Sequence, residues 1–166
     1  MGREIERKFL TNSLVRSVLN GKTGTVFHQA YIVTERSKTI RVRIAGYKAY
    51  LTIKGETQGV SRIEFEYEIP VEDASQLISL FAGKVLKKTR YNFYYEGFEW
   101  DIDVFHENNE GLIVAEIELE SEDQQFPVPP WIGQEVSGVD KYFNSYLVEH
   151  PFVSWEKEKI SHVIHQ

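Results

Sequence analysis

The stretch EIERKFL, residues 4–10, places a charged side chain at every second position near the start of the chain. Side chains of a β-strand alternate between its two faces, so Glu4, Glu6 and Lys8 share one face. Arg7 lies on the opposite face, and we expect it to point away from the other three. The shared face either meets solvent or binds something charged, and the rest of the chain bears on that choice.

With this first stretch included, the same spacing is present in at least seven stretches of the chain, most of them with apolar residues at the intervening positions. Such alternation is typical of antiparallel β-structure. The side chains that share a face in these stretches are Arg41 and Arg43; Thr52 and Lys54; Arg62, Glu64, Glu66 and Glu68; Lys88 and Arg90; Asp101 and Asp103; and Glu116, Glu118 and Glu120.

A sheet with one solvated face explains this alternation in any single strand, and for one strand alone we favour that interpretation. Two features of the whole set favour a ligand instead. Like charges stand two residues apart on one face, about 7 Å, where they repel unless opposite charge lies between them. Acidic and basic pairs are also segregated by strand. Clustered carboxylates suit Mg²⁺ or Mn²⁺ and clustered Arg and Lys suit phosphate, so a metal with several phosphates satisfies both signs.

The chain is predicted to be one mainly β (α+β) domain, residues 1–166, with a closed eight-stranded antiparallel barrel and helices packed outside. A barrel of about eight strands has room for one small ligand. Gly46 and Gly97 each predict a hairpin turn. The predicted strands are residues 3–9, 26–33, 38–45, 48–54, 61–69, 90–96, 98–105 and 112–120. The predicted helices are residues 13–19, 71–82 and 140–149; residues 126–133 are a loop because of their prolines, and 154–166 a charged helix or a frayed end.

The composition excludes several classes of protein. A formal net charge of −6 over 166 residues argues against a general nucleic-acid binder. Without cysteine, the chain has no disulfide and no thiolate metal site. It shows no apolar leader and no apolar run of membrane-spanning length, so we expect a cytoplasmic protein with no membrane partner. The aromatic-rich outer faces suit a homodimer or a cover of helices equally well.

The ordered series of motifs resembles the CYTH superfamily, also called the triphosphate tunnel metalloenzymes. The resemblance covers nearly the whole chain. It implies an eight-stranded tunnel that binds a triphosphate and two divalent cations, Mg²⁺ or Mn²⁺. The short bacterial members, which this chain resembles most, are typically inorganic triphosphatases. The motifs that carry the resemblance are Glu4-x-Glu6-x-Lys8, Arg41-x-Arg43, LTIKG, Glu64-x-Glu66, Lys88-x-Arg90, WDIDVF, GLIVAEIELE and DKYFNSYL.

The resemblance also implies roles for individual residues, with Glu4, Glu6 and Lys8 as the catalytic set. Substrate binding falls to Lys8, Arg41, Arg43, Lys54, Lys88 and Arg90, with Lys141 near the tunnel mouth. Metal binding falls to Glu4, Glu6, Glu116 and Glu118, with Glu64, Glu66 and Asp103 as inner- or outer-sphere contributors. Rim or surface positions are expected for Arg62, Glu68, Glu99, Asp101 and Glu120, a plain strand role for Thr52, and loop packing for Trp131.

The activity that the resemblance implies is hydrolysis of inorganic tripolyphosphate to pyrophosphate and phosphate. A metal-activated water performs such a reaction without a nucleophilic side chain. The alternatives are a thiamine triphosphatase, a nucleoside triphosphatase, a class IV adenylate cyclase and a non-catalytic polyphosphate-binding module. The compact chain and the lack of an obvious adenine pocket favour the inorganic triphosphatase.

Overall fold

The computed structural model describes residues 2–155, and within them the fold is dominated by antiparallel strands. The strands are β1 (Gly2–Thr11), β2 (Thr25–Glu35), β3 (Lys38–Ala45), β4 (Lys48–Gly55), β5 (Ser61–Ile69), β6 (Val85–Tyr95), β7 (Phe98–Phe105), β8 (Ile113–Glu118) and β9 (Ile132–Glu135). The helices are α1 (Val15–Leu19), α2 (Val71–Leu77) with a π-helical extension Ile78–Ala82, and α3 (Asn144–Glu149), and 3₁₀ turns lie at Glu107–Asn109 and Asp140–Tyr142.

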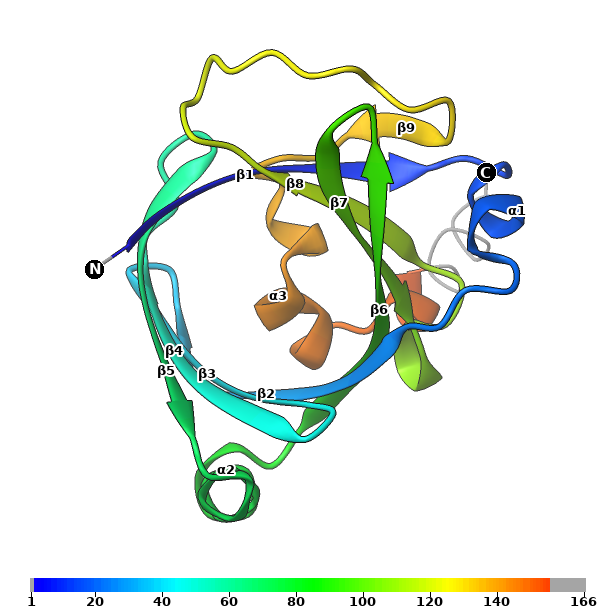
Figure 1. Ribbon diagram of the computed structural model, residues 1–166. Coiled ribbons are helices and arrows are strands. Elements are labelled where there is room, and N and C mark those ends of the chain that lie inside the picture. Colours follow the sequence, from blue (N-terminus) through cyan, green and yellow to red (C-terminus); the bar gives the residue numbers. More distant parts are fainter. Residues whose placement is uncertain (1, 156–166) are drawn as a thin grey trace, which may run out of the picture.

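Eight of the strands close into an antiparallel barrel, as the sequence predicts (Figure 1). The order is β5-β4-β3-β2-β6-β7-β8-β1, and β5 pairs back with β1 to complete the ring. Strand β1 is the closing strand because one of its edges serves two neighbours. Residues 2–5 pair with β5 and residues 9–11 with β9, while residues 6–10 pair with β8 on the other edge.

Two layers cover the outside of the barrel. The outward side chains of β1, β7 and β8 form an aromatic-rich core with α1 and Trp131, which is 3% exposed and packs edge-to-face on Trp100. Trp131 therefore packs as the sequence predicts. The outward side chains of β3 and β4, among them Val42 and Ala49, pack against Ala74 of α2. Burial of these apolar surfaces stabilises the barrel wall from outside.

Helix α3 differs from this arrangement, because it lies within the ring of strands at the rear of the barrel (Figure 1). Its Leu147 is fully buried against Leu86, Phe105 and Val114, which have the same strand parity as the charged residues and so point inward. The expectation that residues 140–149 cover the outside is therefore wrong. The cause is that the inward positions become apolar at this end, and an apolar helix face covers them.

The strand and helix predictions hold with local differences. The hairpin turns fall at Gly46 and Gly97, and Glu96 and Gly97 both have positive φ, as a two-residue type I′ turn requires. Strand β6 begins at Val85, earlier than predicted. The predicted loop 126–133 overlaps β9, a short edge strand that the sequence analysis missed.

The prediction for 154–166 falls mainly on residues 156–166, which lie outside the described residues. Within residues 2–155, the helices are too short and too polar to cross a bilayer.

Candidate active site

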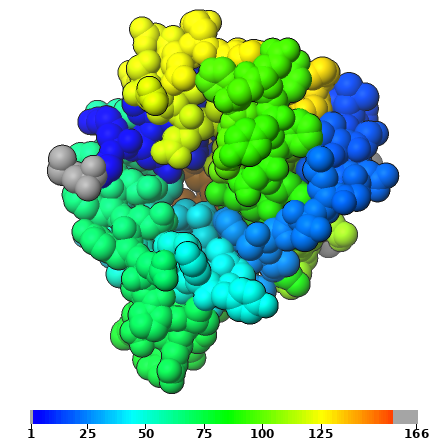
Figure 2. All heavy atoms as spheres, viewed as in Figure 1, coloured from blue at the N-terminus to red at the C-terminus, as the bar shows by residue number. Residues whose placement is uncertain are grey.

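The interior of the barrel holds a cavity of about 160 Å³ whose lining is almost entirely charged. Figure 2 shows its opening on the viewed face, with the region of α3 at the bottom of the hollow. Seven basic and seven acidic side chains contribute to the wall, because the inward positions of the strands carry them. They are Lys8, Arg41, Arg43, Lys54, Arg62, Lys88 and Arg90, and Glu4, Glu6, Glu64, Glu66, Asp101, Glu116 and Glu118.

Two carboxylates in this wall, those of Glu6 and Glu118, have no ion pair among the described residues. The register of β1 and β8 places the two residues directly opposite each other, where like charges destabilise a sheet. Burial, then the nearby Glu116 and Glu4, raises the pKa of Glu6 to about 8. The pKa of Glu118 is also raised, first by burial and then by Glu4 and Asp101. This part of the wall therefore has an excess of negative charge.

Glu4, in contrast, is held by two cations. Its carboxylate accepts from Lys54 Nζ at 3.2 Å and lies 3.4 Å from Arg62 Nε. Burial alone would raise the pKa of Glu4, but the two cations outweigh it and hold the pKa well below its usual range. Lys54 Nζ also lies 3.2 Å from Glu64, so one ammonium bridges two carboxylates of different strands.

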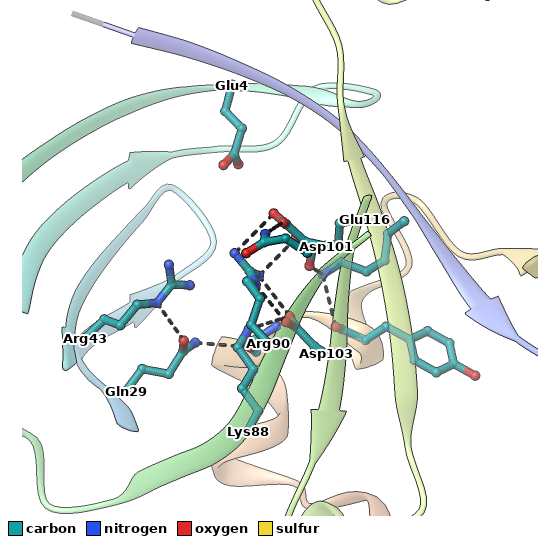
Figure 3. Close-up of polar contacts among 12 residues, drawn as sticks. Glu4, Gln29, Arg43, Lys88, Arg90, Asp101, Asp103 and Glu116 are labelled. Carbon is teal, nitrogen blue, oxygen red and sulfur yellow. Dashed lines mark hydrogen bonds and ion pairs between the residues drawn. The ribbon is translucent and has the colours of Figure 1, made fainter. Parts of the chain in front are cut away.

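A buried ion-pair network forms the wall on β6 and β7 (Figure 3). Lys88 Nζ donates to Asp103 Oδ2 at 2.7 Å, and Arg90 donates through Nε to Asp103 Oδ1 at 2.7 Å and through a terminal nitrogen to Oδ2 at 2.9 Å. Arg90 also lies 3.4 Å from Glu116. Asp103 is fully buried, and although burial opposes ionisation, Arg90 and Lys88 hold its pKa far below its usual range.

The two arginines of β3 point into the same cavity. Arg41 contacts Thr52 and Glu66 through one terminal nitrogen, at 3.2 and 3.3 Å, while its buried Nε has no partner among the described residues. Arg43 Nε donates to the side-chain oxygen of Gln29 at 3.0 Å. Burial, then the neighbouring Arg41 and Arg90, lowers the pKa of Arg43 to about 9. Buried guanidinium groups with unused donors are suited to bind phosphate oxygens.

The acidic side of the cavity fits a divalent cation by the chemistry of its donors. Mg²⁺ and Mn²⁺ prefer carboxylate oxygens, and Glu6 and Glu118 present two such groups that have no cation of their own. As they stand, the side chains of residues 2–155 include no group of three or more metal-ligating residues. The other carboxylates of the lining are paired with Lys8, Arg41, Lys54, Arg62 and Arg90. A metal would thus require some of these ion pairs to open.

The structure brings most of the predicted site residues to one cavity and leaves two outside it. Asp103 lies behind the lining, with both carboxylate oxygens bonded to Lys88 and Arg90. Lys141 points its ammonium toward the rings of Tyr142 and Trp155, about 5 Å from each centroid, instead of into the cavity. The predicted residues that line the cavity are Glu4, Glu6, Lys8, Arg41, Arg43, Lys54, Glu64, Glu66, Lys88, Arg90, Glu116 and Glu118.

Several contributors to the site escaped the sequence analysis. Arg62 and Asp101 line the cavity, contrary to their predicted rim or surface positions, and their strand parity alone could have indicated this. Thr52 is fully buried and its hydroxyl donates to Glu66 at 2.8 Å, so it is more than a plain strand residue. Gln29 is also fully buried beside Arg43. An uncharged residue in a hydrophobic strand carries no charge pattern that would reveal it.

The outward side of β1 behaves as predicted. Arg7 forms a partly exposed pair with Glu135 of β9, at 2.6 Å, on the face opposite Lys8. Lys8 is 5% exposed and lines the cavity. Glu68, Glu99 and Glu120 are exposed and do not line the cavity, in agreement with the sequence analysis.

Comparison with known proteins agrees with this geometry. Residues 2–146 match the CYTH domain, and the chain belongs to the CYTH domain family, as the motif series predicts.

Two characterised relatives of this chain are both inorganic triphosphatases. The chain is 44% identical over 158 residues to that of Acetivibrio thermocellus, covering 95% of this chain and 100% of the relative. It is 36% identical over 149 residues to that of Nitrosomonas europaea, covering 87% and 95%. The crystal structure of the inorganic triphosphatase NE1496 is similar with a TM-score of 0.62 and 33% identity, covering 89% of this chain and 95% of that one.

Proposed function

We propose that this protein is a divalent-metal-dependent hydrolase that cleaves inorganic triphosphate to pyrophosphate and phosphate inside the barrel. The observation that carries the proposal is the two-signed cavity: seven cations and seven carboxylates share about 160 Å³. The two inorganic triphosphatases that are 44% and 36% identical to this chain support the assignment.

The basic side chains bind the triphosphate. Arg41 and Arg43 present guanidinium groups from β3, and Lys88 and Arg90 present an ammonium and a guanidinium from β6 on the neighbouring side of the ring. A guanidinium binds phosphate oxygens in a planar, two-point fashion, whereas Lys8 and Lys54 act as point charges. Cations from several strands around the ring fix a flexible polyanion in one orientation, which supplies the positioning that phosphoryl transfer needs.

The acidic side chains hold the cation, with Glu6 and Glu118 as its first ligands and Glu4 and Glu116 beside them. When bound, a divalent cation neutralises phosphate charge and lowers the pKa of a coordinated water. The chain's own contribution is to exclude bulk water, to orient the terminal phosphate and to supply the carboxylates that would hold the cation. Lys54 and Arg90 pair with Glu4 and Glu116, so the cations that would bind phosphate and the carboxylates that would hold the metal are neighbours.

Phosphate release tests the proposal directly. We expect turnover of tripolyphosphate with Mg²⁺ or Mn²⁺ and none in EDTA, with ATP and thiamine triphosphate as competing substrates. Glu118→Gln should abolish turnover, whereas Glu120→Gln, two residues along and outside the cavity, should leave it unchanged. Tight tripolyphosphate binding without turnover of any substrate would identify a binding module, and cyclic AMP formed from ATP would identify a cyclase.

A second candidate function is hydrolysis of an organic triphosphate, and one observation favours it. A larger cavity of about 500 Å³ adjoins the charged one and shares Thr39, Arg62, Phe143 and Ser145 with it. Its other walls include Tyr146 and His150, whose rings lie 4.5 Å apart. An organic group linked to the triphosphate would find room there, and faster turnover of ATP or thiamine triphosphate than of tripolyphosphate would support this candidate.

Three finer points belong to the same proposal. Mg²⁺ or Mn²⁺ is the cation that carboxylate ligands favour, in a two-metal arrangement. A cytoplasmic location agrees with the lack of cysteine, since disulfides are typical of oxidising compartments. Association into a homodimer stays a prediction, which sedimentation velocity would test.

A further inference from the structure

The uncharged side chain of Gln29 in β2 connects the two basic walls of the cavity through hydrogen bonds (Figure 3). Its side-chain oxygen accepts from Arg43 Nε at 3.0 Å. Its side-chain nitrogen donates to Tyr31 Oη at 3.0 Å and to Asn144 Oδ1 at 3.1 Å. Asn144 Oδ1 also accepts from Lys88 Nζ at 2.7 Å. A continuous chain of bonds therefore runs from Lys88 through Asn144 and Gln29 to Arg43.

The direction of every bond in this chain is determined by its two ends. An ammonium such as that of Lys88 can only donate, so Asn144 presents its oxygen to it. The same oxygen accepts from Gln29, so Gln29 presents its nitrogen on that side and its oxygen toward Arg43. The Nε of Arg43 can also only donate. Reversing the amide of Gln29 would set donors against donors at Arg43, so its orientation is unique.

Because the side chain of Gln29 is uncharged, it leaves the positive charge of Arg43 available to a bound anion. The other cavity arginines have carboxylate partners: Arg41 pairs with Glu66, Arg62 with Glu4, and Arg90 with Asp103 and Glu116. Among the described residues, Arg43 has no carboxylate within ion-pair distance, and the charges that act on it include the cations Arg41 and Arg90. Gln29 therefore holds one edge of the guanidinium without neutralising it. Within residues 2–155 the two terminal nitrogens of Arg43 donate no hydrogen bond, which leaves them for an anion.

Resting on the proposed function, we propose that Gln29 is a positioning residue for the triphosphate. It orients Arg43 by its Nε, leaves the positive charge unshared, and ties that orientation to Lys88 and to the rear helix α3 through Asn144. A hydrogen-bonded amide performs this task where a carboxylate could not, because a carboxylate would compete with phosphate for the same guanidinium.

Two substitutions at Gln29 separate positioning from mere structural support. Gln29→Glu keeps the shape and the bond to Arg43, adds a neutralising charge and replaces the donor toward Asn144 with an acceptor. Gln29→Leu removes all of these hydrogen bonds and adds no charge. We expect Gln29→Glu to be more stable than Gln29→Leu, since the leucine leaves buried donors unsatisfied. The affinity for tripolyphosphate should have the opposite order: Gln29→Glu should bind more weakly than Gln29→Leu, and at least about tenfold more weakly than wild type. Gln76→Glu, which adds the same charge on the exposed face of α2, is the matched control.

The measurements are calorimetric titration with inorganic tripolyphosphate in EDTA, thermal unfolding by circular dichroism, and KM and kcat with metal. We expect Gln29→Glu to raise the dissociation constant and KM far more than it changes kcat, and Gln76→Glu to match wild type. If affinity instead follows stability, or if Gln29→Glu binds as tightly as Gln76→Glu, Gln29 has no positioning role. Wild-type protein that neither binds nor hydrolyses tripolyphosphate would overturn the proposed function, and this inference with it.

Discussion

Asp103 offers a quantitative test of how the cavity is built, because it is the buried anion on which two cations depend. Its carboxylate receives three hydrogen bonds, from Lys88 and Arg90, at 2.7 to 2.9 Å. In Asp103→Asn, either orientation of the amide turns a donor toward Lys88 or Arg90. The substitution removes the carboxylate partner of the buried Lys88 and leaves Arg90 with its longer pairs to Asp101 and Glu116. Removing one partner of a buried ion pair costs about 3–5 kcal/mol, so we expect a loss of that order in the free energy of unfolding.

The pKa of Asp103 predicts how the stability difference between wild type and Asp103→Asn changes with pH. The folded protein holds the pKa of Asp103 far below its ordinary value of 3.8, so the stabilisation is fully present above that value. It is lost as the pH falls below about 4, where the unfolded chain takes up the proton first. The difference in stability between wild type and Asp103→Asn should therefore be constant near neutral pH and narrow in acid.

Urea unfolding followed by tryptophan fluorescence, in EDTA and at a series of pH values, measures this difference. Asp101→Asn is the matched control, two residues along β7, because Asp101 lines the open cavity and its pKa is raised, chiefly by burial. We expect the control to change stability by less than about 1 kcal/mol. An Asp103→Asn variant as stable as the control would refute the reasoning, and a parallel loss of Mn²⁺ affinity without loss of stability would restore Asp103 as a metal ligand.

Three further predictions follow from the same geometry. Because the pKa of Glu6 is raised to about 8, metal-free wild type should lose stability as pH rises from 4.5 through 8, by an upper limit of about 5 kcal/mol. Glu6→Gln should reduce this slope in thermal unfolding and leave the part due to Glu118 and Asp101, whose pKa values are also raised; an unchanged slope would contradict the assignment. Arg62→Ala should weaken tripolyphosphate binding several-fold by calorimetry, since Arg62 lines the cavity; an unchanged dissociation constant would return it to the rim. Arg7→Ala should cost less than about 1 kcal/mol in urea unfolding and leave KM unchanged, because its pair with Glu135 is partly exposed, and a larger effect on either would show that β9 supports the site.

The charged lining could be predicted from the sequence because strand parity is a local property. Glu6 and Lys8 are two residues apart, so any β-strand places them on one face whatever surrounds it. The closed barrel then follows because opposite charges on several strands need a common interior. The resemblance to CYTH proteins supplied the roles, which the alternation alone left open.

Other parts of the site depend on contacts that no local pattern records. Gln29 and Thr52 are uncharged, and they matter because Gln29 accepts a hydrogen bond from Arg43 and Thr52 accepts one from Arg41. In each pair the two residues lie on different strands, so no local sequence pattern connects them. The inward placement of α3 depends on where the lining changes from charged to apolar, at Leu86 and Phe105. Lys141 shares the charge of the true lining residues, but a turn directs it toward aromatic rings.

The balance of the lining explains how one small cavity tolerates so many buried charges and still binds highly charged ligands. Seven cations and seven carboxylates cancel when all are ionised, and most are paired across strands at 2.7 to 3.6 Å. A polyanion alone would displace carboxylates from Lys54 and Arg90 and leave them unpaired, at the cost that burial imposes on a lone charge. A divalent cation alone would compete with the same ammonium and guanidinium groups. On the proposed function, binding both together would exchange internal ion pairs for external ones, so Mg²⁺ or Mn²⁺ should tighten tripolyphosphate binding beyond the affinity measured in EDTA.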